Sequence, residues 1–517
     1  MVMKKEESFS WWDIHSFLKP FFWRVCYSLI IIELLSLIAF FSDSFRAVVL
    51  LVISLAVFLA ALKDIRYGLY VALAELFIGG FGYLFWIEIG GFRLSFRLAL
   101  FSLLFLAGII HIIRRRKITL SRWSGWPFYV AFIFVVIGGV VNGVLQGYSA
   151  KDVFLDMNGY LYYGLFFVFF EAVHSWETVT RVMMVWLASL LVSFWKVVFV
   201  LYIFTHQFDQ IFVGLIYRWV RDTRVGEITS FSFFYRIFFQ SHIYAVILLL
   251  FFFFILALYF LPKQQGYSRK FLYIWISWSL MSWFIITLGY SRSFWIGLVL
   301  SFMVSFVVLW RLFHLPLRRF FLLALLQGGI ALVALLAIGI VVNLPGLPQT
   351  SSSDFSAFSF LEERTSDVSE ERAAGSRFAL LSPLLQKIGE NPWLGTGFGT
   401  VVSYQSKDPR AIAAANGGLY TTYSFEWAYL DTVSEVGVAG LLVYFIFLGY
   451  IVRSGVQIVV RDHVSSPQGF FAVVSLLGIF VLFVVHIFTP YLNHPLGIGY
   501  SMFIAAVFYY FHSLSKI

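Results

Sequence analysis

Long apolar runs separated by short polar connections dominate the chain. About fourteen of these runs reach the length that an α-helix needs to cross a bilayer. The runs near Leu76 and Leu165 contain polar residues. The approximate centres of all the runs are Ile31, Leu55, Leu76, Leu103, Phe134, Leu165, Leu190, Leu250, Leu280, Met303, Val333, Phe445, Gly478 and Ala506. The pattern predicts an all-α, polytopic membrane bundle of about 12–14 transmembrane helices.

Two long polar connections interrupt this pattern and divide the chain. The first, at about 206–239, lies within an expected N-terminal helix bundle of residues 1–343. The second spans 344–430 and is followed by C-terminal transmembrane helices over 431–517. Long loops on a rigid scaffold often carry function, so we expect the active residues in the second connection.

The cationic residues of the short connections alternate along the chain. Clusters such as Arg114–Lys117 and Arg318–Arg319 fall on one side if the N-terminus is cytoplasmic. The positive-inside rule then places both termini in the cytoplasm and both long connections outside a cytoplasmic membrane. These outside loops are nevertheless basic, and an anionic ligand is the physical reason we expect for that charge.

Composition supports the membrane class and excludes several others. The chain has 61% hydrophobic and 12% charged residues, with a mean hydropathy of +0.87, which no soluble fold requires. The net charge of +10 indicates cytoplasmic loops rather than nucleic-acid binding. Cys26 is the single cysteine and excludes an intramolecular disulfide. No His-x-x-x-His pair or cysteine cluster is present, so we expect neither a metal nor another cofactor.

Two arginines in polar surroundings are candidates for binding an anion. Arg292, between Ser291 and Ser293, lies at the outside end of two adjacent spans. A lone arginine there could simply extend to the interface, but its polar neighbours favour a binding role. Arg377 begins a segment with helical spacing, and a guanidinium binds a phosphate through two parallel hydrogen bonds. A solvated loop arginine is the alternative.

Gly395-Thr-Gly397-Phe-Gly399 follows Asn391-Pro392 and predicts a tight turn. No predicted strand precedes the glycines and no P-loop lysine follows them, which argues against a nucleotide site. Glycines instead allow the backbone to approach a ligand or a helix closely.

Three ionisable residues, Glu33, Glu75 and Lys196, fall inside predicted spans. Such groups are costly in a membrane and often functional. A structural pair between Lys196 and one glutamate is the interpretation we favour, and a proton relay is the alternative. A relay would suit a transporter of an anionic or lipid-linked sugar, although the chain shows no evident inverted repeat.

The order of these motifs resembles the O-antigen ligases and Wzy-type O-antigen polymerases. Members similarly carry a Ser-Arg pair before a large periplasmic loop, an arginine opening a loop helix, and a Pro-hydrophobic-x-Gly-x-Gly turn. They then carry His-Asn-x-x-Leu, Glu-x-Gly and a further glycine. This chain matches with Ser291-Arg292, Arg377, Pro392–Gly397, Glu426–Leu430, Glu435-Val-Gly437 and Gly440, with Glu426 replacing the family's histidine.

The resemblance implies a GT-C-like glycosyltransferase of the cell envelope that makes surface polysaccharide. The donor would be a glycan on undecaprenyl diphosphate or a similar polyprenyl diphosphate, and the acceptor a hydroxyl of a glycan, a lipid or a protein, without a metal. We therefore expect catalytic roles for Arg292, Arg377 and Glu426. The residues expected to bind substrate are Arg236, Ser291, Arg372, Gly395, Gly397 and Tyr429. A non-catalytic assembly subunit is the further alternative if Glu426 marks lost activity.

Overall fold

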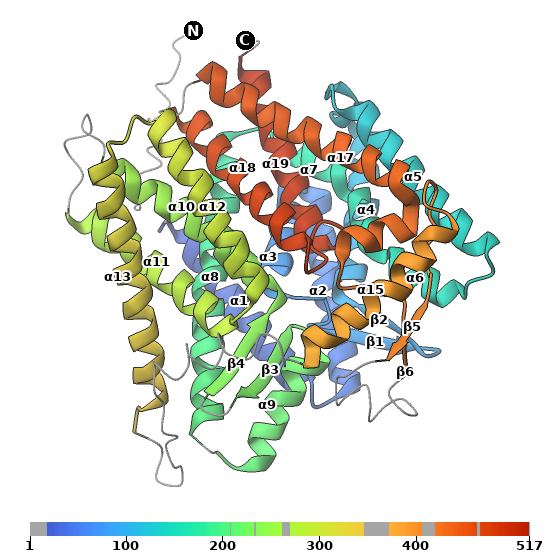
Figure 1. Cartoon of the computed structure of the whole chain (residues 1–517), viewed down its shortest axis with the longest axis horizontal. Helices are drawn as coiled ribbons and strands as arrows, with labels where there is room; N and C mark the ends of the chain where they lie inside the picture. Colours follow the sequence, from blue (N-terminus) through green and yellow to red (C-terminus); the bar gives the residue numbers. More distant parts are fainter. Residues whose placement is uncertain are drawn as a thin grey trace. The chain divides into compact units, whose positions relative to one another are not determined.

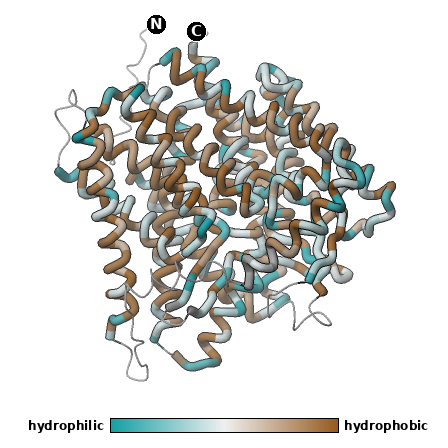
Figure 2. The backbone as a smooth tube through the Cα atoms, in the orientation of Figure 1, coloured by the Kyte–Doolittle hydropathy of each residue, from teal (hydrophilic) through white to brown (hydrophobic). Residues whose placement is uncertain are grey.

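The computed structural model describes residues 18–206, 208–231, 234–260, 269–345, 372–405, 419–462 and 466–515. These residues form helices and three antiparallel two-stranded sheets (Figure 1). Twelve helical segments among them are long and apolar enough to cross a membrane, and Figure 2 shows how apolar residues dominate the tube. The predicted all-α polytopic membrane fold is thus confirmed. Parts of the predicted loop, at 346–371 and 406–418, lie outside the described residues.

The spans differ from the expected pattern at three places. The run near Leu76 is a helix of only 14 residues, α3 (Ile65–Ile78), which is too short to cross a bilayer. The run near Leu165 qualifies only as a composite segment, Ala150–Ala172, in which a 3₁₀ turn joins two helices. The last helix, α19 (Pro495–Leu514), has 20 residues but lies outside the twelve because its Tyr, Ser and His residues lower its hydropathy.

The contacts divide the chain into two units that interleave along the sequence. The first unit comprises residues 1–116, 172–357 and 458–478, and the second 117–171, 358–457 and 479–517. The first unit contains α1 (Pro20–Ala39), α2 (Asp43–Lys63), α3, β1 (Trp86–Ile89), β2 (Phe92–Ser95), α4 (Phe96–Arg115), α8 (Trp176–Thr205), α9 (Gln210–Asp222), β3 (Gly226–Phe231), β4 (Phe234–Phe239), α10 (Ile243–Tyr259), α11 (Arg269–Gly289), α12 (Arg292–Arg311), α13 (Leu317–Val342) and the first part of α18 (Pro467–His486).

The apolar helix α10 forms the centre of the first unit. Every residue from Ile243 to Leu258 is buried, which explains why this run is hydrophobic all round rather than amphipathic. The peripheral helix α2 differs, since its Val48, Leu51 and Leu55 are more than half exposed. Contiguous exposed apolar faces of this kind are rare in soluble proteins and mark lipid-facing surfaces here.

The ionisable groups inside the first unit form pairs. Lys196 donates to Glu33 at 2.7 Å, and Arg97 donates to Glu75 through two nitrogens at 2.8 and 3.0 Å. The predicted structural pairing of Lys196 with one glutamate is confirmed. Pairing offsets the cost of burying each charge, so no separate task is needed to explain these residues.

The second unit has an aromatic core between its long helices. Its elements are η2 (Leu120–Arg122), α5 (Trp126–Leu145), α6 (Ala150–Leu161), η3 (Tyr162–Leu165), α7 (Phe166–Ala172), α15 (Arg372–Glu390), β5 (Val402–Gln405), β6 (Leu419–Thr422), all but the last residues of α17 (Ala428–Asp462), the second part of α18, and α19. Phe132 stacks on Tyr444 at 4.5 Å, and the Tyr444 and Tyr163 hydroxyls are hydrogen-bonded at 3.0 Å. This core fixes α5 and η3 against α17, where the candidate site lies.

Candidate functional site

The long helix α17 is broken at Gly437. This residue has a φ of 73° and a ψ of 176° inside the helix, a conformation that favours glycine. The break leaves the carbonyl of Ser434 without its normal helical partner. Thr396 fills this place, donating its backbone N–H to the Ser434 carbonyl at 2.7 Å and its hydroxyl at 3.1 Å.

The same break frees two backbone donors on the other side of Gly437. Val438 donates its N–H to the Pro392 carbonyl at 2.9 Å, and Ala439 donates to Trp393 at 3.2 Å. An interrupted helix in apolar surroundings must have such groups satisfied by protein. The Pro-Trp-Leu-Gly-Thr-Gly turn and the Glu-Val-Gly sequence therefore form the two halves of one structural joint.

The glycines of the turn allow this close approach. Gly395 and Gly397 have φ values of 75° and 94°. A Cβ atom on Gly395 would lie 2.6 Å from the Gly437 nitrogen, and one on Gly397 would lie 2.3 Å from the Gly143 nitrogen of α5. The glycines were expected to let the backbone approach either a ligand or a helix, and in the structure they let it approach helices α5 and α17.

Side chains of α5 and α6 hold the turn from the other side. Asn142 donates its amide to the Gly395 carbonyl at 2.8 Å, and the Gly399 N–H donates to the carboxylate of Asp156 at 2.8 Å. The turn is therefore bonded to three helices, α5, α6 and α17, all within the second unit.

Three carboxyl groups come together behind the turn. Asp156, Asp431 and Glu435 each offer an oxygen, and these oxygens lie within 4.8 Å of one another. Asp431 and Glu435 are buried, whereas Asp156 is half-buried. The Tyr160 hydroxyl donates to Glu435 at 2.8 Å, and the Asn493 amide donates to Asp431 at 3.2 Å.

Such a group of carboxyls is chemically constrained. Three negative charges at this separation in apolar surroundings require protons or a cation to balance them. Oxygen ligands suit hard cations such as Mg²⁺ or Ca²⁺. No sequence motif predicts this cluster, because Asp156 is distant from α17 in the chain; the available signal is an acidic residue within an apolar run.

In the first unit, three predicted residues are brought to one turn between α11 and α12. Arg236 of β4 donates its Nε to the Gly289 carbonyl at 3.1 Å, at the end of α11. Ser291 occupies the N-cap position of α12 without a side-chain capping bond to the helix. Its hydroxyl is hydrogen-bonded to that of Ser293 at 3.0 Å. Arg292 is the first residue of the helix and is half-buried. The Nη1 atom of Arg236 also lies 3.8 Å from the carboxylate Oε2 of Glu227 in β3.

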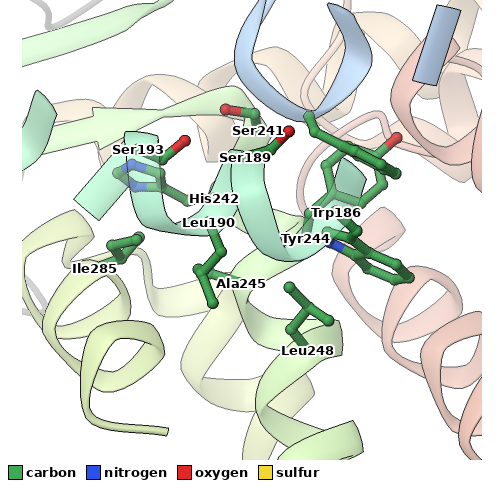
Figure 3. A pocket seen from close by; sticks show the side chains of 11 residues that line it. Trp186, Ser189, Leu190, Ser193, Ser241, His242, Tyr244, Ala245, Leu248 and Ile285 are labelled. Atoms are coloured by element: carbon green, nitrogen blue, oxygen red, sulfur yellow. The ribbon is translucent and has the colours of Figure 1, made fainter. Parts of the chain in front are cut away.

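A small cavity lies in the same unit (Figure 3). His242 accepts a hydrogen bond from the Phe239 N–H at 3.3 Å and lines the cavity together with Ser189, Ser193 and Ser241. Apolar residues such as Leu190 and Leu248 form another part of its wall (Figure 3). The cavity has room for about one water molecule, which is far too small for a lipid-linked sugar.

The remaining predicted residues lie in the second unit. Arg372 and Arg377 belong to α15, although their side chains lie outside the described part of the chain. Glu426 is exposed on a bend just before α17 begins. Tyr429 donates its hydroxyl to the Phe483 carbonyl at 2.9 Å, and its ring contacts that of His486 edge-on at 4.7 Å.

A small apolar core connects α15 with the segment that carries Glu426. Leu380 and Leu384 of α15 pack with Val402 of β5 and with Phe425. The rings of Phe378 and Trp427, which directly follow Arg377 and Glu426 in sequence, are 6.1 Å apart. At the end of α15, the hydrogen bond from Lys387 to Glu390 at 2.6 Å raises the pKa of Lys387.

Arg377 and Glu426 therefore each directly precede one member of this ring pair. Arg292 belongs to the other unit, and the catalytic roles expected for Arg292 and Arg377 stay predictions.

Comparison with known proteins gives one family match. Residues 277–445 match the family model described as O-antigen ligase. The matched range includes both halves of the Pro392–Gly437 joint, together with Arg292, Arg377 and Glu426, and confirms the resemblance drawn from these motifs. Arg236 and Asp156 lie outside it. No curated protein sequence matches the chain.

Proposed function

We propose, from the match of residues 277–445 to the O-antigen ligase family model, that the protein transfers a glycan from a polyprenyl-diphosphate donor to an acceptor hydroxyl. The reaction breaks the bond between the sugar and the diphosphate and forms a new glycosidic bond. The acceptor hydroxyl passes its proton to a base, for which Glu426 is the candidate, and polyprenyl diphosphate leaves with the electron pair of the broken bond. No metal takes part in this proposal.

The observation that carries the proposal is the joint between the turn and α17. It uses the two motifs that mark the family, and it lies at the start of an apolar span rather than in a soluble domain. A rigid scaffold at this place suits a reaction between a membrane-bound donor and a group outside the bilayer. The family match and the twelve spans support the same assignment of a multi-pass membrane enzyme of surface polysaccharide synthesis.

We assign Arg292 and Arg377 to the diphosphate. Negative charge develops on the leaving group as the glycosidic bond breaks, and fixed guanidinium groups stabilise it in the transition state. Arg236 and Ser291 support Arg292 from the same turn. Arg372 adds positive charge at the start of α15. Gly395 and Gly397 contribute through their lack of a side chain, which allows the turn to pack against α17 and α5.

We assign Glu426 to the acceptor hydroxyl. It is exposed, lies beside α15 and could accept a hydrogen bond from a sugar hydroxyl. Tyr429, the second residue of α17, offers an aromatic surface for a sugar ring while its hydroxyl stays bonded to Phe483.

The topology belongs to the same proposal. Both termini are cytoplasmic, and the connections at about 206–239 and 344–430 face outward, between an N-terminal bundle over 1–343 and C-terminal helices over 431–517. The pairing of Glu33 with Lys196 and of Glu75 with Arg97 favours a structural role for these residues over the proton relay that a transporter would use.

The decisive experiment uses the purified full chain in liposomes with a polyprenyl-diphosphate glycan and a set of glycan, lipid and protein acceptors. We expect glycan transfer accompanied by equimolar release of polyprenyl diphosphate. Movement of the intact donor across the bilayer without cleavage would instead support a transporter. Absence of both would support a non-catalytic role.

A further inference from the structure

Two large apolar side chains at the tip of the turn are unusually exposed. Trp393 is 67% exposed and Leu394 is 68% exposed. Their backbone is fixed, however, because Trp393 accepts the hydrogen bond from Ala439 and Gly395 accepts one from Asn142. A rigid turn that presents a tryptophan and a leucine outward requires a partner for that apolar surface.

The position of the turn along α17 indicates its depth in the membrane. Before Gly437 the helix carries the acidic residues Asp431 and Glu435, whereas an apolar run begins after Gly440. Leu442 and Ile446, which lie one above the other on the helix, are 53% and 54% exposed. The joint therefore holds Trp393 and Leu394 at the level where the polar part of α17 changes to the lipid-facing part.

The neighbouring helix α5 shows the same transition. Its Val141 and Leu145 are 51% and 79% exposed, and its Asn142 and Gly143 contact the turn. The exposed Trp393 and Leu394 thus belong to a turn held by two candidate spans, each of which exposes apolar side chains close in sequence to its contacts with the turn. Tryptophan at the boundary between the polar and apolar parts of a span is typical of the membrane interface.

We propose that the turn Pro392–Leu394 is a membrane-contacting element, with Trp393 and Leu394 lying in the lipid of the bilayer interface. The joint to Gly437 then sets the depth of the turn in the membrane, because it fixes the turn to one level of a membrane-spanning helix. α15 ends at Glu390, directly before this turn, so the proposal places the C-terminal end of α15 close to the lipid headgroups. This level also suits the diphosphate of a lipid-linked donor, an inference that rests on the proposed function. The lipid contact of the turn does not rest on the proposed function.

The test measures lipid contact directly and does not depend on activity. Leu394→Cys and Trp393→Cys are made separately in a Cys26→Ala background, labelled with an environment-sensitive fluorophore and reconstituted into liposomes. Quenching is then compared between aqueous iodide and lipids brominated near the headgroup. Leu442→Cys is the control for a lipid-facing site, and Ser403→Cys, at an exposed position of strand β5, is the control for water.

We expect both labels in the turn to follow the Leu442 label, with several-fold stronger quenching by brominated lipid than the Ser403 label shows. Labels quenched by iodide to the same extent as Ser403 would place the turn in water and overturn the proposal. Protection from both quenchers would also overturn it, because another protein surface would then cover the turn. Two independent label sites keep the test informative if one variant fails to fold.

Discussion

The N–H of Val438 donates to the carbonyl of Pro392 at 2.9 Å, across the break in α17. Together with the bonds from Ala439 to Trp393 and from Thr396 to Ser434, it joins the large loop to a membrane span that follows it in sequence. It exists because Gly437 leaves the helical conformation and frees the donor. The loop is thus part of the helix's own hydrogen bonding, which explains how a largely polar segment is held in register with the bilayer.

Gly437→Ala should disrupt this joint. A Cβ at Gly437 would lie 2.1 Å from the Trp393 carbonyl oxygen, and the left-handed φ adds strain of about 1–3 kcal/mol. We expect a lower Tm in detergent and loss of transfer. Gly449→Ala in the same helix is the control, since its Cβ would meet nothing within 4 Å. An equal Tm for both variants would contradict the role of the joint.

Arg292→Lys and Arg377→Lys should each impair transfer although they keep the charge. Lysine cannot reproduce the paired donors of a guanidinium, and loss of one such donor costs on the order of 10²–10³ in rate. The measurement is initial transfer rate in membranes with matched expression. Arg318→Lys, an exposed position at the start of α13, should leave the rate unchanged. Full activity in both test variants would remove these arginines from diphosphate binding.

Glu426→Gln should lower transfer, because an amide oxygen accepts a hydrogen bond from the acceptor hydroxyl but does not take its proton. Glu426→His should retain part of the activity, since imidazole can serve as the same kind of base. Rates across pH at matched expression provide the test. A fully active Gln variant at every pH would leave Glu426 with a helix-terminal role only.

Removal of divalent metal should leave transfer unchanged. The negative charges of Asp156, Asp431 and Glu435 can be neutralised by protons or by a cation. We expect protons, because the proposed reaction requires no metal. Dialysis against EDTA, followed by transfer and Tm measurements, checks this. A lower Tm that Mg²⁺ or Ca²⁺ restores in the native chain, but not in Asp156→Asn, would identify the cluster as a cation site.

Cysteines placed on the two expected sides of the membrane should label differently. A membrane-impermeant maleimide added to intact cells should modify Ser403→Cys and spare Lys117→Cys, because the Arg114–Lys117 cluster is expected in the cytoplasm. Both variants need the Cys26→Ala background. The reverse pattern would invert the proposed topology.

The sequence by itself determined the features that depend on local pattern. Apolar runs of sufficient length predict spans because a helix in lipid must satisfy its backbone internally, and most predicted runs are helices. The segment after Arg377 is helical within α15, and α12 begins at Arg292 as expected. Each of these outcomes depends on neighbouring residues along the chain.

Only the tertiary structure decided the relationships between distant segments. Periodicity does not encode that Pro392 caps the second half of α17, or that Asp156 meets Asp431 and Glu435. These contacts form because a broken helix and buried carboxyls must find partners wherever the packing of α5, α6 and α17 places them. Local pattern fixes which residues need a partner, and the packing of the helices determines which partner each residue meets.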